Sequence, residues 1–162
     1  MKVLGSVALA AFISIPAFAA DAPKLKDGKL SIEAEKGKIN KKMKLVKDAK
    51  ASAGVVMVAD KGGEAVYEFI ADEAGDYVIW GRVLGATGTT DSFFVIVNDE
   101  KTKTWDISSK TYTWRPVINR GDKSPKVTLK KSKNTIKIKN REAKAKLDKL
   151  YIAKPGQKPP KK

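Results

Sequence analysis

The stretch Ala74–Val97 constrains the fold of this chain more than any other. It contains two apolar segments, Tyr77–Leu84 and Ser92–Val97, joined by a loop rich in Gly and Thr. Successive side chains of a strand point to opposite faces, and the first segment has aromatic or β-branched residues on both faces. Residues 78, 80, 82 and 84 share one face, and residues 77, 79 and 83 share the other. The pattern predicts a strand buried on both sides, in the middle of a β-sandwich.

Arg82 is the one charged residue of the first segment, and we expect it to look inward among apolar neighbours. A buried charge needs a partner, and Asp91, just before the second segment, is the candidate. Two interpretations stay open. Either Arg82 and Asp91 form a structural ion pair that locks the loop 85–90, or Arg82 recognises a ligand beside this loop.

The remaining chain also reads as strands separated by turns. Short alternating or apolar segments end at turn-forming runs such as Asp60–Gly63 and Asn98–Lys101, and none has a convincing helical period. About ten such segments predict an all-β fold, an antiparallel β-sandwich. The expected strands are 30–35, 54–59, 64–70, 77–84, 92–97, 103–107, 112–118, 126–129, 135–139 and 147–152, and residues 39–46 form an irregular connection that carries Met43 and Leu45 inward.

A hairpin is predicted near the end of the chain. Lys126–Leu129 and Thr135–Lys139 flank the turn Lys131–Asn134. Their apolar residues face inward and their lysines gather on one outward face. Like charges repel across strands, so this face needs anions or carboxylates nearby, although lysines also protect a sheet edge from aggregation. The inward residues are Val127, Leu129, Ile136 and Ile138.

The ends of the chain predict an exported single domain. Lys2, the apolar run Val3–Ala19 and the small residues Ala17 and Ala19 at an A-x-A site are typical of a signal peptide over residues 1–20, so no retained membrane span is expected. We therefore expect a periplasmic or secreted protein. Residues 21–29 read as a short linker, 30–153 as the β-sandwich, and 154–162 as a disordered basic tail. The chain has no Cys, so disulfides do not stabilise it.

The charge is strongly uneven. The net charge is +15, yet residues 51–100 contain only Lys61 and Arg82 against nine acids, while residues 101–162 contain twenty Lys and Arg against four. Such a distribution indicates either an acidic partner or a solvated lysine surface. Nucleic acid is the poorer choice of partner, because export argues against it.

Catalysis is disfavoured by elimination. The chain has no His and no Cys, which excludes Ser-His-Asp and Cys-His nucleophilic systems and the usual zinc sites. No phosphate-binding loop or dinucleotide fingerprint occurs. The acids Glu64, Glu68, Asp72 and Glu73 fall on a strand face and in a turn, where solvated charge is the ordinary interpretation, so no enzyme is predicted.

Calcium is a better candidate than catalysis. Glu33 and Glu35 project from the same face of one strand, and Asp148 lies on the last strand, which can pair near them. Calcium takes oxygen ligands from carboxylates and backbone carbonyls. The same acids can equally be ion-paired among so many lysines, and the spacing alone leaves both interpretations open.

Several motifs, in this order, resemble the carbohydrate-binding modules of families 6 and 35. The similarity spans Leu30 to Ile152, almost the whole predicted domain. Each motif is weak alone, but their order and spacing together are specific. The motifs are Ile32–Glu35, Ala51–Gly54, Ala74–Tyr77 with Trp80–Val83, Asp91–Val95, the T-W-x-P-V run around Trp114, Asn134–Ile138 and Leu147–Leu150.

The resemblance implies a jelly-roll sandwich with a structural Ca²⁺ held by Glu33, Glu35 and Asp148. It also implies a ligand site in loops at one end of the sandwich, where an aromatic side chain stacks on a sugar ring and polar groups bind its hydroxyls or carboxylate. The aromatic candidates are Trp105, Tyr112 and Trp114, and the polar candidates are Arg82, Asp91, Arg115 and Arg141. Residues 141–146 depart from the short Gly/Asn loop of these families, which puts a sugar contact there in doubt.

Two functions are therefore expected from different classes. The first is a non-catalytic, exported carbohydrate-binding protein for a polysaccharide, including an anionic one such as a uronate polymer. The second is a structural or adhesive protein of the cell envelope, whose lysine-rich face holds acidic surface polymers or a protein partner.

Overall fold

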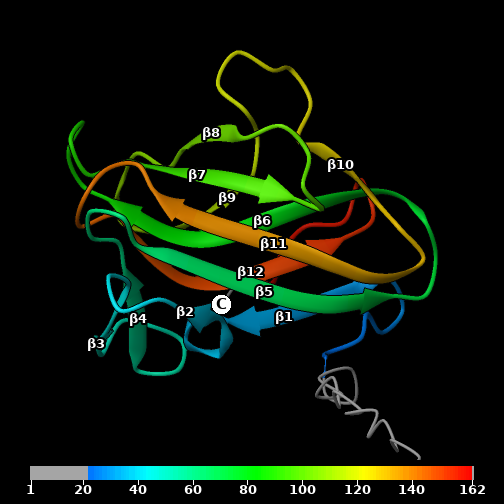
Figure 1. The fold of residues 1–162 in the computed structure, drawn as a ribbon, viewed down its shortest axis with the longest axis horizontal. Coiled ribbons are helices and arrows are strands. Elements are labelled where there is room, and N and C mark those ends of the chain that lie inside the picture. Colours follow the sequence, from blue (N-terminus) through cyan, green and yellow to red (C-terminus); the bar gives the residue numbers. More distant parts are fainter. Residues whose placement is uncertain (1–21, 162) are drawn as a thin grey trace, which may run out of the picture.

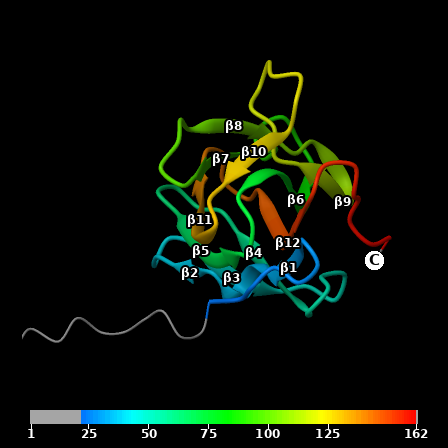
Figure 2. The same ribbon diagram turned by 90° about the vertical axis from the view of Figure 1, so that its right-hand side faces the viewer.

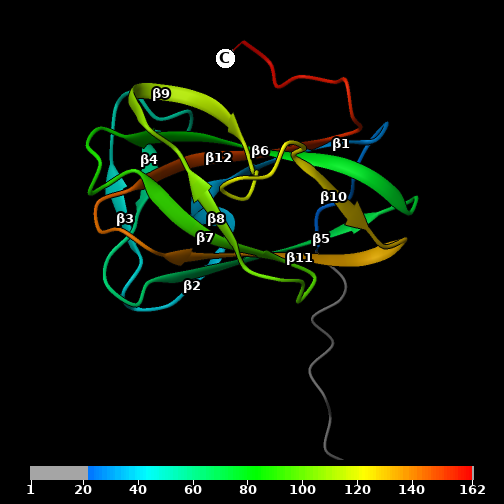
Figure 3. The same cartoon turned by 90° about the horizontal axis from the view of Figure 1, so that it is seen from above.

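Two antiparallel β-sheets face each other across one apolar core (Figures 1 and 3). The computed structural model describes residues 22–161, so the predicted signal peptide lies outside the described residues. The all-β antiparallel sandwich predicted from the sequence is confirmed. One sheet joins, in this order, β10 (Lys126–Leu129), β6 (Gly75–Gly85), β12 (Lys146–Ala153), β4 (Val55–Val58) and β3 (Lys44–Lys47), with β9 (Ser109–Pro116) also paired with β6 and β1 (Lys29–Glu33) with β12.

The second sheet has five strands and is continuous from edge to edge. Its order is β2 (Lys38–Ile39), β5 (Glu64–Ala71), β11 (Ser132–Asn140), β7 (Ser92–Val97) and β8 (Lys103–Asp106). A single 3₁₀ turn, η1 (Ala34–Lys36), links β1 to β2. Across residues 22–161, no helix is long and apolar enough to cross a membrane.

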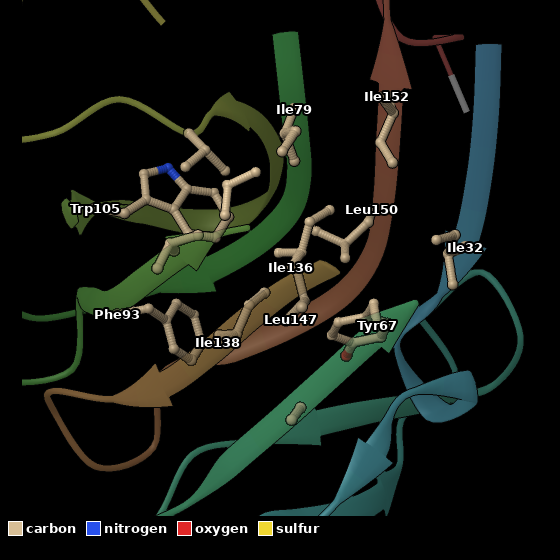
Figure 4. Packing of buried hydrophobic residues seen from close by; sticks show 14 of the residues in the cluster. Ile32, Tyr67, Ile79, Phe93, Trp105, Ile136, Ile138, Leu147, Leu150 and Ile152 are labelled. Carbon is tan, nitrogen blue, oxygen red and sulfur yellow. The ribbon is translucent and has the colours of Figure 1, made fainter. Parts of the chain in front are cut away.

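The core lies between the two sheets and includes one residue that we expected in the ligand site (Figure 4). Trp105 is completely buried, its ring centroid lies 5.9 Å from that of Phe93, and its Nε1 donates a hydrogen bond to the Pro116 carbonyl at 2.8 Å. The prediction that Trp105 binds a ligand is therefore wrong, because the two sheets enclose it.

The central strand β6 turns only one of its faces to this core. Tyr77, Ile79 and Val83 are core residues, while Trp80, Arg82 and Leu84 face away from the second sheet and are half-buried. The expectation that Arg82 looks inward is wrong for this reason. The face that carries it is the outer face of the seven-stranded sheet.

A β-bulge in β12 changes which residues of the last strand face the core. The register against β6 shifts between Leu147 and Lys149. Leu147, Leu150 and Ile152 consequently all reach the core, although strict alternation separates Leu147 from the other two. The extra residue at the bulge is Asp148, which is fully buried.

The predicted hairpin of Lys126–Leu129 with Thr135–Lys139 does not form. β10 pairs with β6, whereas β11 pairs with β5 and β7 in the other sheet. Residues 130 and 131 therefore cross between sheets. The inward residues of both strands are nonetheless buried as predicted, because each strand presents its apolar face to the same core.

Three further segments differ from expectation. The segment expected as a linker is attached to β5, since the Leu25 N–H donates to the Ile70 carbonyl at 2.9 Å and the Leu25 side chain is buried. Met43 is buried as predicted, but Leu45 lies in β3 and is 44% exposed. The basic tail 154–161, expected to be disordered, runs along the outer face of the seven-stranded sheet (Figures 2 and 3), with Gln157 half-buried.

Candidate functional site

A groove of about 620 Å³ lies on the outer face of the seven-stranded sheet, and we call it the outer-face groove. It is bordered by the loop before β4, by side chains of β6, β9 and β12, and by the C-terminal tail. The volume is within the usual range for small-ligand sites. Its lining residues are Ala49, Lys50, Ala51, Ser52, Arg82, Trp114, Lys149 and Pro160.

Trp114 supplies the aromatic surface of this groove. It lies on β9 directly across from Arg82 of β6. Its ring makes an edge contact with Tyr151, with centroids 6.2 Å apart and planes at 65°. The indole Nε1 atoms of Trp114 and Trp80 are enclosed and have no hydrogen-bond partner within the described part of the chain. Trp114 is thus half-buried, with an unused hydrogen-bond donor on its enclosed edge.

Tyr112 neighbours the groove but has a fixed structural partner. Its hydroxyl donates to Asp48 Oδ2 at 2.6 Å, and the Arg82 guanidinium carbon lies 4.9 Å from its ring centroid. Burial and the hydrogen bond to Asp48 raise the pKa of Tyr112. The same bond, with the Lys50 amide and Lys146, lowers the pKa of Asp48. Tyr112 therefore ties β9 to the loop before β4.

Arg82 has a partner, but not the expected one. Its Nη1 forms a short ion pair with Asp148 Oδ2 and donates to the Lys50 carbonyl at 3.2 Å. The interpretation of Arg82 as one half of an ion pair holds, whereas the choice of Asp91 is wrong. The β-bulge places Asp148 beside Arg82, and alternation along β12 gives no sign of this.

The other polar candidates lie in a separate cluster at the end of the sandwich, around the loop 85–91. Arg115 Nη2 donates to the Ser108 carbonyl at 2.8 Å, and Arg141 Nη1 donates to Glu142 Oε1 at 2.7 Å. The Asp91 carboxylate accepts a short hydrogen bond from Ser108, and its amide donates to Glu142 Oε2 at 2.9 Å.

The charged side chains of this end cluster bind to one another or to neighbouring polar groups, and the cluster has little aromatic surface. Burial opposes ionisation of Glu142, but hydrogen bonds from Ser92 and the Asp91 amide and the charge of Arg141 lower its pKa overall. The adjoining cavity, about 300 Å³, is lined by Gly85, Ala86, Thr87, Gly88, Asp91, Ser108, Ser109 and Lys110. None of these side chains can stack on a sugar ring.

The structure thus divides the predicted ligand residues into three groups. Arg82, Tyr112 and Trp114 come together at the outer-face groove, the end cluster holds Asp91, Arg115 and Arg141, and Trp105 belongs to the core. Sequence reasoning missed Lys50, Lys149 and Pro160 as groove residues. Only Lys149 had a usable signal, its place next to Asp148 on the last strand.

The residues assigned to calcium do not fit that ion as they are arranged. Glu33 Oε1 lies 2.6 Å from Lys149 Nζ, and Asp148 is paired with Arg82. Glu35 Oε2 is enclosed and has no hydrogen-bond partner within the part of the chain that the structure describes. No group of three His, Cys, Asp or Glu side chains able to hold a metal ion occurs between residues 22 and 161. Calcium binding itself stays a prediction.

Solved structures with the same fold include carbohydrate-binding modules. A family 35 carbohydrate-binding module from Clostridium thermocellum is 18% identical, with a TM-score of 0.61, over 76% of this chain and 98% of that one. The C-terminal family 6 module of a laminarinase from Zobellia galactanivorans is 16% identical, with a TM-score of 0.57, over 78% and 99% of the two chains.

Larger enzymes contain the fold as one part. An exo-β-1,3-galactanase from Phanerochaete chrysosporium is 19% identical, with a TM-score of 0.65, over 77% of this chain. The chain spans only 29% of the length of that enzyme. No protein-family model and no curated protein sequence matches the chain. At these identities the likeness shows the fold alone, and that fold is the one of the family 35 and family 6 carbohydrate-binding modules.

Proposed function

We propose that this chain is a non-catalytic carbohydrate-binding protein that holds a polysaccharide in the outer-face groove, with Trp114 as the aromatic surface. The observation that carries the proposal is that the groove combines the half-buried Trp114 ring with polar and cationic side chains. The fold shared with carbohydrate-binding modules supports it.

The chemistry of the groove suits a sugar. An aromatic face packs against the apolar C–H face of a pyranose, while hydrogen-bond donors at the rim orient its hydroxyls. Trp114 provides the first of these, and Ser52 and Lys50 border the same space. The end cluster has the polar groups without the aromatic surface, so the groove is the better site.

An acidic polysaccharide is the ligand class that we favour. The net charge of the chain is +15, and Lys50, Arg82 and Lys149 all border the groove. Arg82 and Lys149 already have carboxylate partners, so Lys50 is the cation best placed to meet a ligand carboxylate. Export belongs to the proposal too, because residues 1–20 have the pattern of a signal peptide.

A second function rests on the outer face of the five-stranded sheet. Lys133, Lys137 and Lys139 alternate along β11, and Glu68 of β5 accepts ion pairs from Lys133 at 2.9 Å and Lys38 at 3.0 Å. This face suits an acidic envelope polymer or protein held by charge alone. Such binding weakens steeply with salt and does not depend on Trp114.

The test is a binding screen against immobilised neutral and acidic polysaccharides, with two neighbouring variants of β9. For any polysaccharide that the native chain binds, Trp114→Ala should weaken affinity by about tenfold, because loss of the stacking contact costs about 1.4 kcal/mol. Arg115→Ala, a change in the end cluster, should bind like the native chain. Far-UV circular dichroism and thermal melting should show that both variants are folded.

Three outcomes would count against the proposal. Loss of binding in Arg115→Ala but not in Trp114→Ala places the ligand at the end cluster. Equal binding by all three proteins with a steep salt dependence favours the lysine face of the five-stranded sheet. Failure of the native chain to bind any neutral or acidic polysaccharide rejects carbohydrate binding.

A further inference from the structure

Two carboxylates and two cations form a closed set beside the outer-face groove. Glu33 pairs directly with Lys149 across β1 and β12, and Lys149 pairs directly with Arg82 across β12 and β6. Asp148, the bulge residue, lies next to Lys149 in sequence and contacts Arg82. Three strands therefore contribute alternating charges to one patch of the sheet.

Each carboxylate oxygen in this set has a donor. Glu33 Oε1 is 2.6 Å from Lys149 Nζ, and Glu33 Oε2 accepts a 2.5 Å hydrogen bond from Ser52 Oγ. Asp148 Oδ1 accepts a hydrogen bond from the Ser52 amide at 2.8 Å and lies 3.3 Å from the Ser52 Oγ, and Asp148 Oδ2 is paired with Arg82 Nη1. Ser52 thus links Glu33 to Asp148, and Lys149 and Arg82 supply the remaining donors to the two carboxylates.

The burial of Asp148 makes a positive partner necessary. Its side chain has no exposed surface, while that of Arg82 is only 19% exposed. An unpaired carboxylate in such a place is strongly unfavourable. Arg82 also donates to the Lys50 carbonyl, so the same guanidinium fastens the loop before β4 to the sheet.

A calcium ion would have to displace these cations. Two negative and two positive side chains are already balanced, and calcium needs about six to eight oxygen ligands. The oxygens of Glu33 and Asp148 are occupied, and Glu35 Oε2 is enclosed without a partner in the described part of the chain. The number of available ligands is too small while Arg82 and Lys149 are in place.

We propose that Arg82 and Lys149 replace a structural metal ion in this chain, so that side-chain cations join β1, β12 and the loop before β4. The proposal does not depend on carbohydrate binding.

The experiment measures thermal unfolding of the full chain in a chelator and in excess CaCl₂, together with calcium binding by calorimetry. The native chain should have the same melting temperature in both buffers and should bind no calcium. Arg82→Gln with Lys149→Met should melt at a lower temperature than the native chain in both buffers, because Asp148 and Glu33 lose their cationic partners. A matched control, Arg120→Gln, removes an exposed Arg–Asp pair elsewhere and should melt close to the native chain in both buffers.

Several results would overturn the proposal. A higher melting temperature of the native chain in CaCl₂ shows that the two cations border a metal rather than replace it. A double variant as stable as the native chain shows that the two cations do not join these strands. If the double variant does not fold in either buffer, Lys149→Met decides, because Glu33 is 25% exposed and tolerates loss of its partner. This single variant should melt at a lower temperature than Arg120→Gln in both buffers, and equal melting temperatures of the two variants reject the proposal.

Discussion

The ring of Trp105 occupies the space directly over Gly81, where a side chain would have to be. A Cβ built on Gly81 would lie 2.3 Å from Cη2 of Trp105. β6 therefore carries no side chain at the point where the indole of β8 packs against the opposite sheet. This contact joins the edge strand β8 of the five-stranded sheet to β6 of the other sheet.

The Gly81–Trp105 contact predicts two large losses of stability. Trp105→Ala should lower the free energy of unfolding by about 3–5 kcal/mol, as for other buried aromatics, and Gly81→Ala should also destabilise the chain because the indole must move. Gly88→Ala is the control, since an added Cβ meets nothing within 4 Å there. Urea unfolding followed by tryptophan fluorescence measures all three. A Gly81→Ala variant as stable as Gly88→Ala contradicts this packing argument.

The fold could be predicted from local patterns because most strands have one clear apolar face. β5 and β7 alternate as expected, and their inward residues are core residues. Trp105 could not be placed this way, because an isolated tryptophan on a short strand suits a core and a sugar platform equally well. The Trp105 ring fits in the core because Gly81 has no side chain. This is a contact between strands that are distant in the sequence, so the local pattern does not reveal it.

The candidate site was less predictable, for reasons of register and topology. Arg82 was correctly recognised as needing a partner, but the bulge that brings Asp148 to it leaves no mark in the alternation of β12. The predicted hairpin failed because turn-forming residues at 131–134 are equally compatible with a crossing between two sheets. The tail has no apolar anchor in its sequence, so its place beside Trp114 depends on the surface to which it binds.

Acid should destabilise the chain partly through Asp48. Hydrogen bonds from Tyr112 and the Lys50 amide lower the pKa of Asp48 from its ordinary value of 3.8. A carboxyl whose pKa is lowered by folding stabilises the native state above its unfolded pKa, and this contribution is lost as the pH falls through the folded value. Between about pH 5 and pH 2, the free energy of unfolding should therefore fall more steeply for the native chain than for Asp48→Asn.

Tyr112→Phe separates the causes of this pH dependence. It removes the largest of the interactions that lower the pKa of Asp48, but leaves the Lys50 amide and Lys146 in place. The slope of its free energy of unfolding against pH should lie between the slopes of the native chain and of Asp48→Asn. Chemical denaturation at several pH values gives the slopes. Identical slopes for the native chain and Asp48→Asn contradict the prediction.

Glu68 should stabilise the lysine face of the five-stranded sheet by separating two lysines. It pairs with Lys133 and Lys38, and these pairs lower its pKa. Glu68→Gln removes the negative charge between the two lysines, which then repel each other. It should lower the free energy of unfolding by about 0.5–1 kcal/mol at low salt. High salt should remove most of this difference, because it screens exposed charges. Urea unfolding of both proteins at low and high NaCl measures it, and a loss that persists in high salt points to packing instead.

Removal of residues 155–162 should uncover Trp114. Pro160 borders the outer-face groove together with Trp114, and Gln157 is half-buried with an enclosed Oε1 that has no hydrogen-bond partner in the described region. The enclosed Nε1 atom of Trp114 also lacks a partner among residues 22–161. Enclosed polar groups without partners cost stability, so we expect a ligand to displace the tail at little cost.

Acrylamide quenching of tryptophan fluorescence measures this uncovering without any ligand. The truncated chain should be quenched more strongly than the native chain, and Trp114→Phe in both backgrounds should abolish the difference. The double variant Lys158→Ala with Lys161→Ala keeps the prolines but removes two charges. Acrylamide should quench its fluorescence to the same extent as that of the native chain. If a polysaccharide ligand is found, truncation should strengthen its binding, because the tail no longer competes for the groove. Equal quenching of the truncated and native chains would show that the tail does not cover Trp114.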